Sequence, residues 1–226
     1  MKFKDLIFKK YKIHATSPQQ QIIIDFYKNV YLPAQPSDYY KGKALEEGGT
    51  SIPKGMSPGI KALVESGIIK KGQKVCDYGA GKFGANANPL RDLGIKVYAY
   101  DPFNGTDANG WKGITNKLPP KEEKFDICFT SYVLNVVPEH IERSIIAKSN
   151  RIAKKCYHVV RNLDIYTDVK KALLSDPSLK DLSKEDIIHF CVFGTKTSKG
   201  FQRIPMLERK GWKQITKASG WKLYGK

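Results

Sequence analysis

The sequence has no run of about 18 apolar residues, the length that a membrane-spanning helix requires. Its first 13 residues alternate lysine with apolar side chains and do not form the apolar segment of a signal peptide. We therefore expect a soluble, intracellular and cytoplasmic protein with no membrane partner. Nothing in the sequence indicates an oligomeric state.

Cysteine is scarce, and its spacing excludes the common metal motifs. The chain has four cysteines, with no C-x-x-C pair and no His/Cys cluster. Each lies in or beside an apolar, β-rich run, which favours buried free thiols over metal ligands. We therefore predict no metal site. A hydrophobic content of 41% over 226 residues is enough for the core of one α/β domain with additions.

Acidic residues are few compared with basic ones. There are 22 Asp and Glu against 39 Lys and Arg, a formal net charge of +17. The excess is greatest at the ends: residues 189–226 hold nine Lys and Arg with Glu208 as the only acid, and residues 1–12 hold five lysines with Asp5. Such a charge favours nucleic acid as a partner. A solvated lysine-rich face, an anionic membrane and an acidic protein are the alternatives.

The clearest motif lies between residues 74 and 101. A β-rich run at 75–78 leads into a G-x-G-x-x-G loop at 79–84, followed by helical spacing at 85–93 and a second β-rich run at 96–100 that ends at Asp101. This is the β-loop-α-β layout of a nucleotide-binding half-fold. The glycines let backbone amides approach a polar ligand, and the acid can accept hydrogen bonds from ribose hydroxyls. The alternative is a tight turn that merely needs glycine.

Asp77, two residues before Gly79, distinguishes between classes of ligand. A carboxylate so close to the loop repels a pyrophosphate and attracts a cation. With Gly79, Gly81 and Asp101 it resembles the first two motifs of class I methyltransferases that use S-adenosyl-L-methionine (SAM), over about residues 67–162. The resemblance implies SAM as cofactor, S-adenosyl-L-homocysteine as product, and an enzyme.

The same resemblance implies the roles of individual residues. Asp77 would lie near the amino group of SAM, Gly79 and Gly81 under its methionine part, and Asp101 at its ribose. The expected cofactor-binding residues are Asp77, Tyr78, Gly79, Ala80, Gly81, Gly84, Asp101, Pro102, Phe103, Asn116 and Ser131.

The expected fold is a class I methyltransferase α/β fold: a mostly parallel Rossmann-like sheet with an antiparallel last strand, flanked by helices and preceded by a helical extension. We divide the chain into a basic, helical extension and loop at 1–56 and a methyltransferase domain at 57–226. Helices are expected at 19–31, 58–66 and 139–153. Further strands are expected at 113–115, 125–131 and 156–160.

The last third is less regular. We expect helical structure at 166–174, a polar segment at 177–186, a short basic helix at 201–210, and strand-like runs at 189–193, 212–215 and 221–224. We predict that 189–193 and 221–224 form the final hairpin. Four cations of the basic tract between them are expected to bind nucleic acid: Lys196, Lys199, Arg203 and Lys210.

The residues after strand 125–131 should face the methyl acceptor. That segment lacks the proline pair of exocyclic-amine DNA methyltransferases, and no cysteine follows a proline as in cytosine C5 enzymes. Ser131, Tyr132 and Asn135 are the expected catalytic residues; the alternative for Tyr132 is a packing role. The runs DYGAGKFG, YDPF and YVLNVVPEHIER more narrowly resemble bacterial and phage proteins described as DNA phosphorothioation-associated methyltransferases, which implies a bacterial cell or a phage-infected host.

The sequence therefore predicts a SAM-dependent methyltransferase acting on nucleic acid, with DNA favoured slightly over RNA. Two other hypotheses stay open. One is a methyltransferase for small molecules or proteins, and the other is a SAM-binding module without catalysis.

Overall fold

The computed structural model describes residues 55–120, 124–137, 139–161, 167, 170–171, 191, 195–197 and 200–226. The extension and loop predicted at 1–56 lie outside these residues except for residues 55 and 56, and the polar segment at 177–186 lies wholly outside them. Residues 167, 170 and 171 are helical, in agreement with the prediction for 166–174, and the remainder of that segment is likewise outside.

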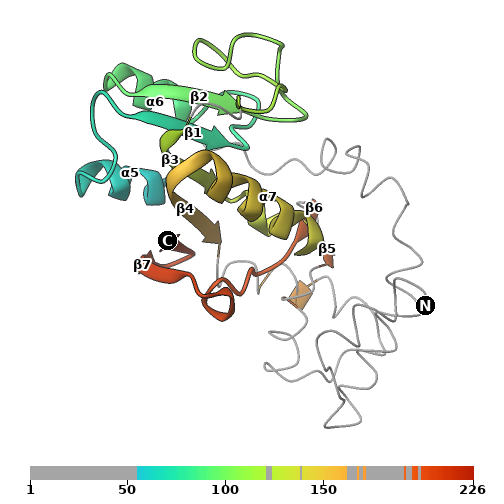
Figure 1. The fold of residues 1–226 in the computed structure, drawn as a ribbon. Coiled ribbons are helices and arrows are strands. Elements are labelled where there is room, and N and C mark those ends of the chain that lie inside the picture. Colours follow the sequence, from blue (N-terminus) through green and yellow to red (C-terminus); the bar gives the residue numbers. More distant parts are fainter. Residues whose placement is uncertain are drawn as a thin grey trace, which may run out of the picture.

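A six-stranded sheet forms the centre of the domain (Figure 1). Its order is β2-β1-β3-β4-β8-β7. The four strands β1 to β4 are parallel, whereas β8 runs antiparallel between β4 and β7. The bounds are β1 Lys74–Tyr78, β2 Lys96–Tyr100, β3 Phe125–Ser131, β4 Ala153–Arg161, β7 Lys213–Ala218 and β8 Trp221–Gly225. A separate two-stranded sheet pairs β5 (Thr195–Thr197) with β6 (Gly200–Gln202).

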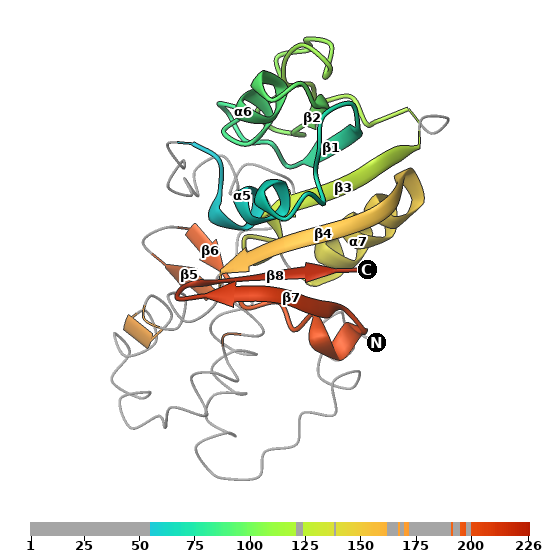
Figure 2. The same ribbon diagram turned by 90° about the vertical axis from the view of Figure 1, so that its left-hand side faces the viewer.

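Helices cover both faces of the sheet, and α5 and α7 lie on opposite sides of it (Figure 2). On one face, α5 (Pro58–Glu65) packs beside β4 and β8 and α6 (Ala87–Asp92) packs beside β2, and both bury apolar residues such as Ile60 and Leu90 in one cluster. On the other, α7 (Glu139–Ile152) packs Ile145 and Ile152 around Phe125. Two short 3₁₀ helices, η3 (Val133–Asn135) and η5 (Glu208–Lys210), complete this second layer. The predicted α/β fold, with a mostly parallel sheet and an antiparallel last strand, is confirmed.

Three expectations for short elements need correction. The third strand is reduced to a single parallel bridge between Tyr100 and Thr115. The basic segment 201–210 is not a helix; it contains the end of β6, an extended stretch and the single turn η5. The final hairpin is formed by β7 and β8, not by 189–193 and 221–224, and Cys191 is helical.

The sequence concealed β7 because it is the edge strand. Almost all of its residues are exposed, so it lacks the apolar alternation that identifies a half-buried strand. The apolar run at 189–193 has the stronger β propensity, yet β8 pairs with the polar strand beside it. Within the part of the chain that the structure describes, no helix is long and apolar enough to cross a membrane.

Candidate cofactor site

The carboxyl ends of the four parallel strands meet at one edge of the sheet, where open α/β sheets bind their ligands. The glycine loop follows β1, and it is attached to the end of β2. The amides of Gly79 and Ala80 both donate to the carbonyl of Tyr100, at 2.7 and 3.0 Å. Ser131 ends β3 at the same edge. The structure thus brings together three segments that the sequence predicts for the site.

Two glycines of the loop are required by geometry. Gly79 has φ +91°, and a Cβ atom there would lie 2.3 Å from Cγ2 of Val133, so a side chain would strain the backbone and collide with η3. Gly81 also has a positive φ, +69°, but no described atom lies within 4 Å of the position its Cβ would take. The loop is therefore closely packed at Gly79 and open at Gly81.

Asp77 is the most unusual polar residue of the site. Its side chain is 0% exposed, and neither carboxylate oxygen has a hydrogen-bond partner among the described residues. Burial and the nearby charge of Asp101 raise the pKa of Asp77 to about 8, and the charge of Arg91 lowers it in part. Because buried carboxylates are normally satisfied, two unpartnered oxygens indicate a place for a polar or cationic ligand group.

Asp101 holds the loops on either side of it. Its Oδ2 accepts the amide of Gly81 at 2.9 Å. Its Oδ1 accepts the amides of Phe103 and Asn104 at 3.0 and 2.8 Å, and the side-chain amide of Asn104 at 3.0 Å. With about two lone pairs on each carboxylate oxygen, Oδ2 keeps capacity for one more donor.

The end of β3 is hydrogen-bonded to the start of α5. The hydroxyl of Ser131 donates to that of Ser57 at 2.9 Å, and the amide of Ser57 donates to Oδ1 of Asn86 at 2.8 Å. Tyr132 follows with φ 63°, an uncommon value for an aromatic residue that is found where the surrounding structure imposes it, often at functional sites. Ser131 and Tyr132 therefore occupy a constrained position beside the glycine loop.

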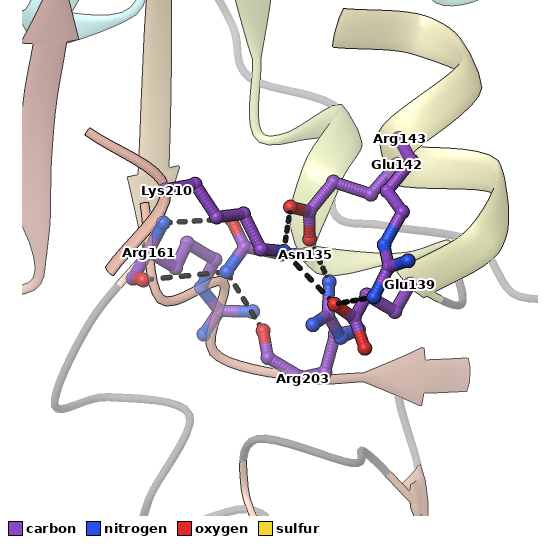
Figure 3. Close-up of polar contacts among 7 residues, drawn as sticks. All are labelled: Asn135, Glu139, Glu142, Arg143, Arg161, Arg203 and Lys210. Atoms are coloured by element: carbon purple, nitrogen blue, oxygen red, sulfur yellow. Dashed lines mark hydrogen bonds and ion pairs between the residues drawn. The ribbon is translucent and has the colours of Figure 1, made fainter. Parts of the chain in front are cut away.

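Asn135 does not have the free side chain that its predicted catalytic role requires. It is 0% exposed, its Oδ1 accepts the amide of Arg161 at 2.8 Å, and its Nδ2 donates to the carbonyls of Arg161 and Arg203 at 3.3 and 2.9 Å (Figure 3). Both side-chain donors are therefore in use. We correct the assignment: Asn135 fastens η3 to the end of β4 and to the segment after β6.

Two of the four residues predicted to bind nucleic acid are engaged in an internal ion cluster (Figure 3). Arg203 is 1% exposed and pairs with the fully buried Glu142. Lys210 pairs with Glu142 and, at 3.3 Å, with Glu139. Arg203 therefore cannot contact a phosphate on the surface, and that prediction was wrong. Lys199 and the side chain of Lys196 lie outside the description.

The other predicted cofactor residues occupy different environments. Tyr78 is 5% exposed and its ring packs on that of Tyr100, with centroids 4.7 Å apart, so its side chain belongs to the core. Pro102 and Phe103 are exposed just beyond Asp101, and Asn116 is exposed just beyond the Tyr100–Thr115 bridge. The remaining two predicted residues, like Gly79 and Gly81, belong to the glycine loop. Ala80 is buried, and Gly84 has φ +58°.

Sequence reasoning missed several polar residues. Ser57 stands at the N-cap of α5, yet its side chain makes no cap hydrogen bond and receives the one from Ser131. Buried His158 lies 2.8 Å from the hydroxyl of Thr130, and burial lowers its pKa to about 3, which keeps the imidazole neutral. A polar residue inside the apolar run of β4 was the available signal for His158.

The cysteines are as the sequence predicts. All four, Cys76, Cys128, Cys156 and Cys191, are buried and free. Among the residues described by the structure there is no group of three or more His, Cys, Asp or Glu that is arranged to hold a metal ion.

Comparisons with family models and with curated proteins find no match to this sequence. Solved structures resemble it at low identity. A protein studied for the conversion of a disulfide bond into a thioacetal group during echinomycin biosynthesis matches with a TM-score of 0.51 and 15% identity, over 83% of this chain and 90% of that one. At this identity the likeness concerns the fold alone.

Two further solved structures have TM-scores slightly lower than 0.51. Magnesium protoporphyrin IX methyltransferase (ChlM) from Synechocystis PCC 6803 with bound SAH has a TM-score of 0.48 and 13% identity, covering 99% of this chain and 94% of that one. DhpI in complex with SAH has a TM-score of 0.49 and 15% identity, covering 83% and 92%. The fold of this chain is the class I methyltransferase fold, defined by the strand order and the antiparallel β8.

Proposed function

We propose that this chain is a SAM-dependent methyltransferase that modifies nucleic acid, with DNA favoured slightly over RNA. The observation that supports SAM most directly is Asp77, a fully buried carboxylate without a partner in the described part of the chain, two residues before an open glycine loop. A cationic ligand group beside it would remove the cost of its burial. The amino group of SAM has that charge.

The residues present fit such a cofactor. Asp77 would hold the amino group, the open backbone at Gly81 would admit the methionine part, and Oδ2 of Asp101 would accept a ribose hydroxyl. Bound SAM supplies an electrophilic methyl group on a sulfonium, and S-adenosyl-L-homocysteine is the product. The protein's own task is then to exclude water and to orient the acceptor.

The acceptor would meet the site at Ser131 and Tyr132. Their position is constrained by the hydroxyl pair with Ser57 and by the left-handed backbone of Tyr132. Asn135 holds the segment after Ser131 and Tyr132 to the end of β4 through two hydrogen bonds to Arg161. It would therefore position the site without touching the acceptor.

The charge of the chain and its narrower resemblance to phosphorothioation-associated proteins favour nucleic acid as substrate. A small-molecule substrate is the second candidate, because ChlM is named for a porphyrin substrate. A binding module without turnover is the third, since the segment after β3 has no recognised acceptor motif.

We expect the affinity for SAM to increase by about tenfold or more between about pH 6 and pH 8, and this increase to disappear in Asp77→Asn. With its pKa at about 8, Asp77 is largely protonated at the lower pH, and an ammonium group binds its ionised form. Calorimetric titration across this range provides the measurement. Asp92→Asn, at an exposed aspartate of α6, is the control and should keep the pH dependence.

The raised pKa of Asp77 also makes the free energy of unfolding depend on pH. In the unfolded chain Asp77 has a pKa of about 3.9, so between about pH 4 and pH 8 the unfolded state releases a proton that the folded state retains. Unliganded wild-type protein should therefore lose stability as the pH rises through this window, and Asp77→Asn should lose less. Identical pH profiles in urea unfolding would contradict the assignment of Asp77.

The function itself is tested by methyl transfer. The protein is incubated with methyl-labelled SAM and a mixture of DNA, RNA and cell extract, and the label is followed through nuclease and protease digestion. Label released by nuclease supports a nucleic-acid methyltransferase. Label that resists nuclease indicates a protein or small-molecule acceptor, and SAM binding without any transfer indicates the binding module.

A further inference from the structure

The C-terminal hairpin gathers exposed cationic side chains. Residues 203–226 contain seven Lys and Arg, with Glu208 as the only acid. Arg203 and Lys210 are taken up by the ion cluster with Glu142. Five further cations lie outside that cluster, and all are exposed except the half-buried Lys222, which pairs with Glu208: Arg209, Lys213, Lys217, Lys222 and Lys226.

Lys217 and Lys222 form a pair that costs stability. They lie directly opposite each other in the register of β7 and β8, and like charges at such positions repel. Glu208 compensates Lys222 at 3.1 Å, and it also accepts the hydroxyl of Tyr224. No carboxylate in the described ranges forms an ion pair with Lys217. Glu208 is therefore the one carboxylate among the described residues that compensates the two opposed lysines.

Protection of an edge strand does not explain this pair. Lysines on an edge strand prevent further strands from adding, and Lys213 serves that purpose at the start of β7. The side chains of Lys222 and Lys217 instead stand on the face that Tyr224 and Glu208 share, because residues opposite each other and residues two apart on one strand point to the same side. A second anion on this face would relieve the repulsion.

The pair lies at the functional edge of the sheet. Because β8 is antiparallel to β4, Lys222 lies beside Val160 and Trp221 beside Arg161, at the carboxyl end of β4. Figure 2 shows β7 and β8 running next to β4. Ser131 and the glycine loop are at the carboxyl ends of the neighbouring parallel strands. The two lysines are therefore at the edge where the acceptor would be presented.

We propose that Lys217 and Lys222 bind the phosphodiester backbone of a nucleic acid and hold it beside the methyl-transfer site. This inference rests on the proposed function, since it assumes a nucleic-acid substrate. Lys217 and Lys222 take the role that the sequence analysis assigned to Arg203. Phosphate contacts of this kind fix register and orientation without selecting the base.

The test compares Lys217→Gln with Lys213→Gln. Both are exposed lysines of β7, but Lys213 lies opposite Gly225, at the other end of the strand and on the other face. The probes are fluorescein-labelled DNA, single-stranded and duplex, and single-stranded RNA, followed by anisotropy over a range of salt concentrations. Lys217→Gln should weaken binding about fivefold and reduce the slope of log K against log salt by about one. Lys213→Gln should change affinity less than about twofold.

The outcomes separate this inference from the proposed function. If the wild type binds nucleic acid but Lys217→Gln and Lys213→Gln reduce its affinity equally and only slightly, the proposed role of Lys217 and Lys222 is wrong. The nucleic-acid substrate is then still supported. A wild type that binds SAM but no probe would overturn both the surface and the nucleic-acid substrate. Binding to vesicles of anionic lipid that depends on Lys217, with no binding to the probes, would assign the surface to a membrane and overturn it as well.

Discussion

Asp101→Ala should reduce the affinity for SAM by about a hundredfold or more, because each hydrogen bond to a charged group contributes about 1.5–3 kcal/mol and a tenfold change corresponds to about 1.4 kcal/mol. Three effects combine in this variant. The ribose would lose its acceptor, and the amide of Gly81 would lose the Oδ2 atom that holds it at 2.9 Å. The turn at Phe103 and Asn104 would lose its three bonds to Oδ1 as well.

Calorimetry with SAM measures the loss, and thermal unfolding shows whether the variant is folded. Asp92→Ala, which removes an exposed carboxylate of α6, is the matched control and should bind SAM like the wild type. Affinity of Asp101→Ala within about threefold of wild type would show that the cofactor lies elsewhere.

The local part of the fold could be predicted from the sequence. The β-loop-α-β unit is contiguous, its strands alternate with turn signals, and the positions of β1, β2 and β3 agree with the prediction within a residue. Three glycines with positive φ mark the loop. Short-range patterns suffice here because each signal and the structure that it specifies lie within about thirty residues of each other.

The pairing of the last strands could not be predicted in this way. An exposed edge strand carries no apolar period, and its partner is decided by packing that involves the whole sheet. The same limit applies to the polar residues. Arg203 and Glu142 are 61 residues apart, so nothing in the local sequence of Arg203 distinguishes a buried ion pair from a surface phosphate contact.

Only part of the geometry around the candidate site follows from local sequence. Asp77 and Asp101 belong to the local motif, and the structure brings both to the glycine loop. Asn135 was assigned to catalysis because it follows β3, but its partners come from β4 and from the segment after β6. Only the tertiary arrangement reveals that these distant backbones use up its amide.

Glu142→Gln should lower the free energy of unfolding by about 3–5 kcal/mol, the usual cost of removing one partner from a buried ion pair. The substitution preserves the size of the side chain, so the loss arises from charge and not from a cavity. Arg203, 1% exposed, would lose its ion pair with Glu142, and Lys210 would keep its contact with Glu139 (Figure 3). Urea unfolding gives the value directly.

Two further variants identify the cause. Glu139→Gln, which affects the more exposed pairs with Arg143 and Lys210, should cost less than about 1 kcal/mol. The double variant Glu142→Gln with Arg203→Met should recover most of the lost stability, because it removes the buried guanidinium together with the carboxylate that pairs with it. A double variant as unstable as the single one would show that the charge of Arg203 is not the cause.

The ion cluster also connects stability to the proposed site. Arg203 accepts a hydrogen bond from Asn135 through its carbonyl and donates its amide to the carbonyl of Asn135. Loosening the segment at Arg203 should therefore disturb η3, and with it Ser131 and Tyr132, while Asp77 and Asp101 stay in place on β1 and β2. For Glu142→Gln we expect methyl transfer to decrease more than SAM affinity at a temperature where the variant is folded, because the acceptor side of the site depends on this attachment and the cofactor side does not.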